Sequence, residues 1–129
     1  MLGVSSYDKA TITACKRAVT ALMKAYLADA SPAFEQEFLR HMVPALDRLF
    51  VHRLRGKEGK DGNALNEVRM LCTSICEGKK VLLADSTIKY QPEKSILKLK
   101  IGDEIKLTPE SFGKLAGAFF REIEAKFGS

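Results

Sequence analysis

The feature that most constrains the fold is a change in the spacing of apolar residues along the chain. Between residues 8 and 77 apolar side chains recur every three or four positions, the period of a helix packed along one side. In SILKLKIGDEIKLT, residues 95–108, they alternate with polar residues, the period of a strand with one exposed face. The helical period then returns. This order predicts an α+β domain.

Three helical regions are expected before the alternating segment, over residues 8–28, about 32–55 and about 64–77. Pro44 removes one backbone hydrogen bond from the second region, so we expect a kink or two helices meeting near Val43. Asn63 is suited to cap the third helix, and Gly78 to end it. A last helix should follow Thr108, which is suited to cap it.

The alternating segment predicts a β-hairpin. Leu97, Leu99 and Ile101 would lie on one face and the lysines between them on the other. The Gly-Asp pair at 102 supplies a turn, and a third strand is expected from about 81 to 90. The predicted fold therefore has three to four N-terminal helices, a small antiparallel hairpin or three-stranded sheet, and a C-terminal helix.

Length and composition favour one domain that folds without a metal or cofactor. The 129 residues are the size of a single domain, and 46% of them are apolar, enough to build a core. The three cysteines are an odd number, and the start, MLGVSSYDKAT, does not resemble a signal peptide. No run of 18 apolar residues is present, so no membrane span is expected. We expect residues 1–129 to form one cytoplasmic domain.

The net charge favours an anionic partner, and one loop concentrates positive charge. Lys and Arg number 21 against 16 Asp and Glu, which gives a net charge of +5. The stretch HRLRGKEGKDGN, residues 52–63, holds Gly56, Gly59 and Gly62 at even spacing together with four Lys and Arg residues. Glycines allow backbone conformations that turn N–H groups toward an anion.

This loop predicts an anion-binding site. Arg48, His52 and Arg55 fall on one side of the second helix, and the start of the third helix at Asn63 offers unpaired backbone N–H groups. A phosphate, or the backbone of a nucleic acid, would suit such a site. The predicted ligand-binding residues are Arg48, His52, Arg53, Arg55, Lys57, Lys60, Asn63 and Asn66.

The alternative is an ordinary exposed connector. The spacing of the glycines matches neither the phosphate loop nor the dinucleotide fingerprint. Arg53 also falls toward the apolar side of its helix, where an arginine needs a partner such as Glu58 or Glu67. That pairing would give Arg53 a structural role.

Histidine and cysteine patterns are compatible with chemistry, but each has a structural explanation. His41 and His52 are possible acid–base groups, although the sequence places no orienting partner beside them. Cys72 and Cys76 lie one helical turn apart, but a zinc site needs two more ligands, and both fall on the apolar side. We therefore assign no catalytic and no metal-binding residue.

The alternating segment also carries charged patterns. Glu104 and Lys106, with Asp85, match the E-x-K spacing of some metal-dependent nucleases, or equally a solvated hairpin face. Lys98 and Lys100, together with Lys106, would either contact a phosphate backbone or protect a strand edge from pairing.

The sequence thus favours a small binding module for an anion or a nucleic-acid backbone. A protein-interaction or homo-oligomerisation domain is the alternative, because apolar stripes are numerous and Met70 is expected opposite the buried side of its helix. A small hydrolase or nuclease is the third possibility.

Overall fold

Helices account for most of the chain. The computed structural model describes residues 3–128. Its α-helices are α1 (Lys9–Ala28), α2 (Pro32–Arg48), α3 (Arg55–Glu58), α4 (Ala64–Cys76) and α5 (Pro109–Phe127), and a 3₁₀ helix, η1, covers Pro92–Lys94. None of the helices formed by these residues is long and apolar enough to cross a membrane.

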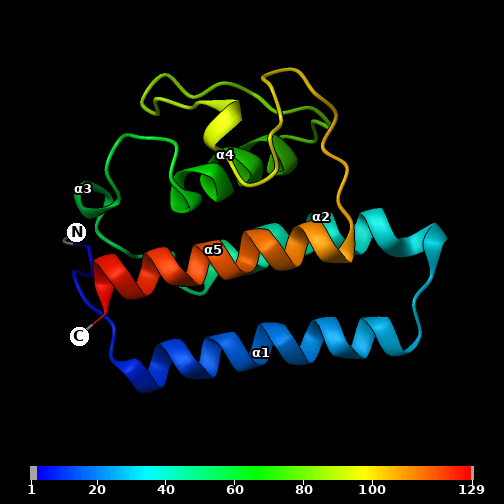
Figure 1. Cartoon of the computed structure of the whole chain (residues 1–129), viewed down its shortest axis with the longest axis horizontal. Helices are drawn as coiled ribbons and strands as arrows, with labels where there is room; N and C mark the ends of the chain where they lie inside the picture. Colours follow the sequence, from blue (N-terminus) through cyan, green and yellow to red (C-terminus); the bar gives the residue numbers. More distant parts are fainter. Residues whose placement is uncertain (1–2, 129) are drawn as a thin grey trace.

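The long helices are arranged around α5 (Figure 1). α4 packs against both α2 and α5, and α1 lies on the other side of α5 from α4. α1 runs antiparallel to α5, and the long connection between α4 and α5 passes over α4. This arrangement leaves one side of α5 between α1 and the connection.

The core is formed where α2, α4 and α5 meet. Its fully buried side chains include Leu39, Val43, Leu46, Phe50, Leu65, Val68, Leu71, Phe112, Leu115, Phe119 and Ile123. Met70 is only 2% exposed, which corrects the expectation that it lies opposite the buried side of α4. The connection passes over α4, and the buried residues of this helix extend beyond the side that faces α2 and α5.

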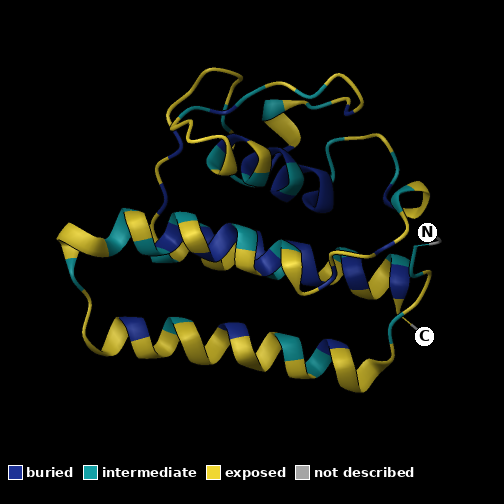
Figure 2. Cartoon of the chain, turned by 180° about the vertical axis from the view of Figure 1, so that it is seen from behind, coloured by how far each residue is buried: buried dark blue, intermediate teal, exposed yellow. Residues whose placement is uncertain are grey.

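α1 is attached to the rest of the molecule by a narrow apolar stripe. Its buried residues are Ile12, Val19 and Tyr26, spaced seven apart, whereas Leu22 and Leu27 are about half exposed. Figure 2 shows the same contrast, because α1 is mostly coloured as exposed while α4 and the layer formed by α2 and α5 carry broad buried surfaces. Few side chains therefore hold α1 against α5.

Several predicted helix ends are confirmed. Asn63 caps α4 by accepting a hydrogen bond from the Asn66 N–H, and Thr108 forms a reciprocal capping pair with Ser111 at α5. α2 runs through Pro44 as one helix, so two separate helices meeting near Val43 are not formed.

The predicted α+β fold is wrong. The chain is mostly helical, and residues 3–128 contain no sheet. Their extended contacts are four isolated bridges that join Val4 to Arg53, Tyr7 to Gly128, Asp61 to Lys89 and Val81 to Glu104. The segment expected as a third strand contributes to two of these bridges and forms no ladder.

The hairpin does not form because side chains take its backbone donors. The Glu67 carboxylate accepts the N–H groups of Ile96 and Leu97 at 2.8 and 3.0 Å, and the Ser95 hydroxyl accepts that of Lys98 at 2.8 Å. Lys98 also has φ = 58°, which turns the chain out of the extended conformation. Amides bonded in this way cannot pair with a second strand.

The end of the same segment is buried but pairs with a helix. Ile105 and Leu107 are fully buried, as the alternation implies. Arg40 of α2 donates to the Ile105 carbonyl, and the Gln36 amide both donates to and accepts from the backbone of Leu107. Side chains of α2 therefore take the place of a neighbouring strand for the Ile105 carbonyl and for Leu107, whereas the Ile105 N–H bonds to the Lys80 carbonyl.

Candidate functional site

A buried carboxylate organises the glycine loop. Glu58 lies at the end of α3, and its side chain is 0% exposed. Its oxygens lie 2.9 Å from Arg53 Nε, 3.2 Å from Arg55 Nη1 and 2.6 Å from Arg69 Nη2. We call these four residues the Glu58 cluster. Three guanidinium groups surround one desolvated carboxylate, so the charge of Glu58 is compensated within the chain.

Arg53 is the most buried cation of the Glu58 cluster. Its Nη2 donates to Asp47 Oδ1 at 2.7 Å, and its guanidinium lies over the Phe119 ring. The Nε atom is close to Glu58 but too poorly aligned for a hydrogen bond, so that contact is electrostatic. The expectation that Arg53 needs an acidic partner such as Glu58 is confirmed, and Asp47 is a second partner that the sequence did not suggest.

The two asparagines close the loop. The Asn63 amide donates to the Glu58 carbonyl at 2.6 Å and to Asp61 Oδ1 at 2.9 Å. The Asn66 amide, which is fully buried, donates to the carbonyls of Gly59 and Asp61. Both side chains therefore hold the loop against the start of α4, and their amide donors are already in use.

The remaining predicted residues do not converge on one space. Lys57 Nζ donates to the Ser5 carbonyl at 2.7 Å and lies over the Phe127 ring. Arg48 and His52 are exposed at the end of α2 and beyond it. Lys60 lines a cavity of about 250 Å³ whose wall also includes Arg55, and that guanidinium is bonded to Glu58 and to the Gly59 carbonyl. Ligand binding by the eight residues stays a prediction, and the contacts of five of them serve the fold.

The other patterns are separated in space. Residues 3–128 hold no group of three His, Cys, Asp or Glu side chains placed to bind a metal. Burial raises the pKa of the Cys72 thiol, which keeps it protonated. Glu104 and Lys106 form an exposed pair at 3.7 Å, and Asp85 accepts hydrogen bonds from Thr87 instead.

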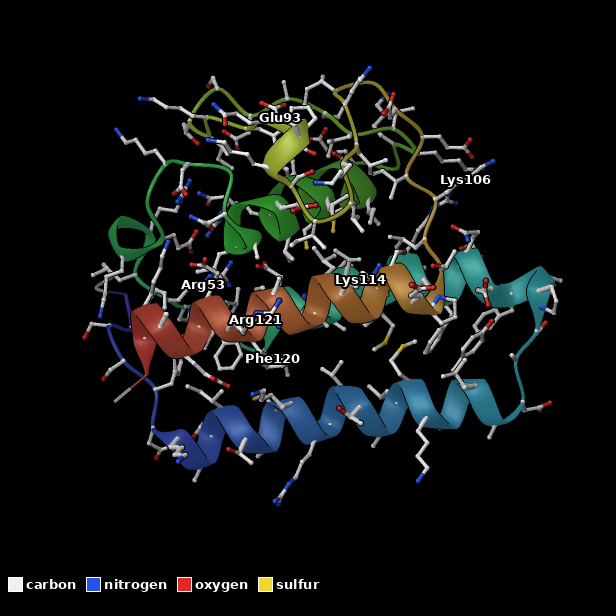
Figure 3. The ribbon with its side chains drawn as sticks, viewed as in Figure 1. Arg53, Glu93, Lys106, Lys114, Phe120 and Arg121 are labelled. Carbon is white, nitrogen blue, oxygen red and sulfur yellow. The ribbon has the colours of Figure 1, made fainter. Side chains whose placement is uncertain are left out.

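A different positively charged surface lies on the exposed side of α5. A pocket of about 400 Å³, called here the basic pocket, is lined by Ser95, Ile96, Lys98, Gly113, Lys114, Gly117 and Arg121. Figure 3 shows Lys114 and Arg121 on the same side of α5, with Phe120 directed toward α1 instead. Three cations from two elements therefore border one pocket whose lining includes no acidic residue.

The cations of the basic pocket are only weakly engaged. The Arg121 side chain forms no hydrogen bond or ion pair with any residue from 3 to 128. Lys114 pairs with Glu110 at 3.4 Å, but both side chains are more than two thirds exposed. Lys98 Nζ donates to the carbonyls of Glu93 and Ser95. An exposed ion pair of this kind contributes about 1 kcal/mol or less, so these side chains can exchange partners at little cost.

Glu67 fixes the wall of the basic pocket that lies opposite α5. Its buried carboxylate binds the amides of Ile96 and Leu97, which precede Lys98. Burial raises the pKa of the Glu67 carboxyl, and the two amide donors oppose that shift. Through these bonds α4 determines where Ser95 and Lys98 lie relative to α5.

An apolar groove adjoins the basic pocket. It has a volume of about 530 Å³ between α1 and α5, and its apolar lining is Val19, Met23, Leu27, Phe112, Ala116 and Phe120. Lys16, Thr20 and Lys24 border it on α1. Gly113 and Gly117 line both hollows, so no side chain at these positions separates the apolar groove from the basic pocket.

Part of this surface was recognisable in the sequence. Gly113, Gly117 and Arg121 are spaced four apart, in a row that runs from the flank of the last helix's apolar stripe to the side opposite it. The contribution of Lys98 was not recognisable, because it depends on the contact of Glu67 with a segment 29 residues away. Comparisons with family models, curated proteins and solved structures found no match to this chain.

Proposed function

We propose that this chain is a binding module that holds an acidic segment of a partner protein at the basic pocket. The observation that carries the proposal is the convergence of Lys98, Lys114 and Arg121 on one pocket with no acidic residue in its lining. Carboxylates are the matching groups, because an arginine fork binds them with two parallel hydrogen bonds.

The apolar groove favours a protein over a nucleic acid as the partner. A nucleic-acid backbone offers charge but little apolar surface, and single strands bind by stacking bases on exposed aromatic rings. Phe112 and Phe120 line the apolar groove but are at most 3% exposed, so their faces are not free for stacking. A peptide offers carboxylates and apolar side chains together.

The charge argues for a foreign partner rather than a second copy. A symmetric dimer formed through this surface would bring together two basic pockets, each with three cations, in a chain whose net charge is +5. Like charges placed opposite each other in an interface disfavour that pairing. A partner with excess acidic residues has no such penalty.

The test is binding of a fluorescently labelled 12-residue peptide of Glu and Ser, measured by anisotropy. Charge reversal of Lys114→Glu together with Arg121→Glu should weaken binding at least about tenfold, and added salt should weaken it further. Lys79→Glu together with Lys80→Glu is the matched control, because these exposed lysines line none of the hollows described above.

Two results would remove the proposal. One is an affinity for the acidic peptide that the Lys114 and Arg121 reversals leave unchanged. The other is tighter binding of a DNA duplex than of the peptide at the same salt concentration, which would return the function to a nucleic-acid backbone.

A further inference from the structure

We propose that the acidic segment is a single amphipathic α-helix that lies lengthwise in the apolar groove between α1 and α5, with carboxylates toward the cations on both sides. This inference rests on the proposed function and adds the shape and the apolar contact of the partner. It depends on three properties of the apolar groove, namely its length, its open floor and the charges along its borders.

The apolar groove has the dimensions of a short helical segment. Its floor on α5 runs from Phe112 to Phe120, and its border on α1 runs from Lys16 to Leu27. At 1.5 Å per residue these stretches are about 12 and 16 Å long. A helix of about two to three turns can therefore contact the full length, using apolar side chains at three- and four-residue spacing.

The floor is open to close approach. A Cβ atom added at Gly113 would meet nothing within 4 Å, and one added at Gly117 would meet only Arg121 Nη1, at 3.5 Å. Packing within residues 3–128 therefore does not require glycine at either position, although glycine lowers helix stability. Without side chains there, a docking helix can lie nearer to the axis of α5.

Apolar side chains are also left uncovered beside this floor. α1 buries only three residues, and Leu27 at its end is 55% exposed although it lines the apolar groove. An apolar stripe on the partner would cover Leu27 and Met23 together with the floor of α5.

Positive charge borders the apolar groove on both sides. Lys16 and Lys24 lie on the α1 side, and Lys114 and Arg121 lie on the α5 side toward the basic pocket. Lys24 and Arg121 form no ion pair with another described residue, and the pair between Lys16 and Glu124 is exposed. A helix with an apolar stripe and glutamates on both flanks matches this order.

The experiment compares three labelled 16-residue peptides binding to the full chain. The first has leucine and alanine in a helical stripe flanked by glutamates, the second has the same composition without a stripe, and the third has lysine in place of glutamate. We expect the striped acidic peptide to bind at least tenfold more tightly than either of the others. Its circular dichroism should show a gain of helix on binding.

Variants of the chain locate the site. Gly117→Leu and, independently, Gly113→Leu should weaken binding of the striped acidic peptide at least tenfold, because leucine would fill the apolar groove. Ala125→Leu, on the exposed part of the same helix outside it, should leave binding unchanged. Two substitutions are used so that a fold defect in one, visible in its circular dichroism, leaves the other to decide.

The outcomes separate this inference from the proposed function. Equal binding of the two acidic peptides, still lost in Arg121→Glu, keeps the acidic partner and overturns the helix in the apolar groove. Striped-peptide binding that both leucine variants leave intact overturns it too. Dimerisation in light scattering that Gly117→Leu abolishes assigns the apolar groove to a second copy and also overturns it. No binding of any acidic peptide removes both proposals.

Discussion

The Glu58 cluster and the basic pocket both gather three cations, but only the Glu58 cluster holds them around a buried carboxylate. In the Glu58 cluster the three arginines surround a carboxylate that is 0% exposed, and Arg53 is bonded to Asp47 as well. In the basic pocket Lys98, Lys114 and Arg121 border a hollow without an acidic lining residue. The position of one buried acid therefore separates a structural cluster from a candidate binding surface.

The two buried glutamates, Glu58 and Glu67, also differ in the groups that they bind. Glu58 binds side-chain cations, whereas Glu67 binds the backbone amides of Ile96 and Leu97. Removing the first should damage the core of the loop, and removing the second should displace a wall of the basic pocket. The substitutions below test this division, from the largest expected effect to the smallest.

Glu58→Ala should have the largest effect on stability. It would leave Arg53 buried with one acidic partner fewer, and loss of one member of a buried ion pair typically costs about 3–5 kcal/mol. Urea denaturation gives the change in the free energy of unfolding. Glu124→Ala, at an exposed pair, should cost about 1 kcal/mol or less. Equal losses in the two variants would contradict a structural role for the Glu58 cluster.

Glu67→Ala should cost about 2–3 kcal/mol, because two backbone donors lose their acceptor in a partly buried place. The same variant should weaken binding of the acidic peptide, since the segment that carries Lys98 would no longer be fixed to α4. Unchanged binding with reduced stability would show that the position of this wall does not matter to the partner.

Glu67→Gln should change the pH dependence of stability, because it removes one titrating group. The pKa of Glu67 is raised in the folded chain, so its proton favours folding below the ordinary value of 4.5. That contribution is lost as the pH rises from 4.5 through the folded pKa. The free energy of unfolding of the variant, relative to the original chain, should therefore increase over this range. A constant difference from pH 4 to 8 would contradict the assignment.

Gly113→Ala should raise the free energy of unfolding by about 0.5–1 kcal/mol, the difference in helix propensity between the two residues. The added Cβ atom would meet nothing within 4 Å, so no strain opposes the gain. Gly59→Ala is the contrasting variant and should destabilise, because Gly59 has φ = 81°. A loss of stability in Gly113→Ala would show that this glycine serves the fold.

The sequence located the four long helices, but it carried α2 about seven residues past its end at Arg48, did not indicate α3, and was insufficient for the connection between α4 and α5. The apolar period and the caps at Asn63 and Thr108 located α4 and α5, because these signals act within a few residues. The alternation of apolar and polar residues over 95–108 correctly indicated that Ile105 and Leu107 are buried. The same alternation wrongly indicated a β-hairpin, because side chains of distant helices, Glu67 and Gln36, bond to the backbone in place of a second strand.

Prediction of the candidate site from the sequence was limited in the same way, because its contacts join residues far apart in the chain. The need of Arg53 for an acid could be inferred from its place on the helix, but not that Glu58 would gather two further arginines. The arginines of the loop therefore pair with an acidic side chain of the same chain. Charge available to a partner lies where α1, α5 and the connection meet, and only the tertiary structure brings these together.

The attachment of α1 has a consequence for motion. Tyr7, just before α1, donates its backbone N–H to the Phe127 carbonyl, and Tyr26, near the end of α1, donates its hydroxyl to Glu35 of α2. Between these anchors Ile12 and Val19 are the buried residues. A helix tied at its ends and thinly packed along its length can bow outward while the rest stays folded. Its middle amides should exchange with deuterium before those of α4, giving the apolar groove an adjustable width.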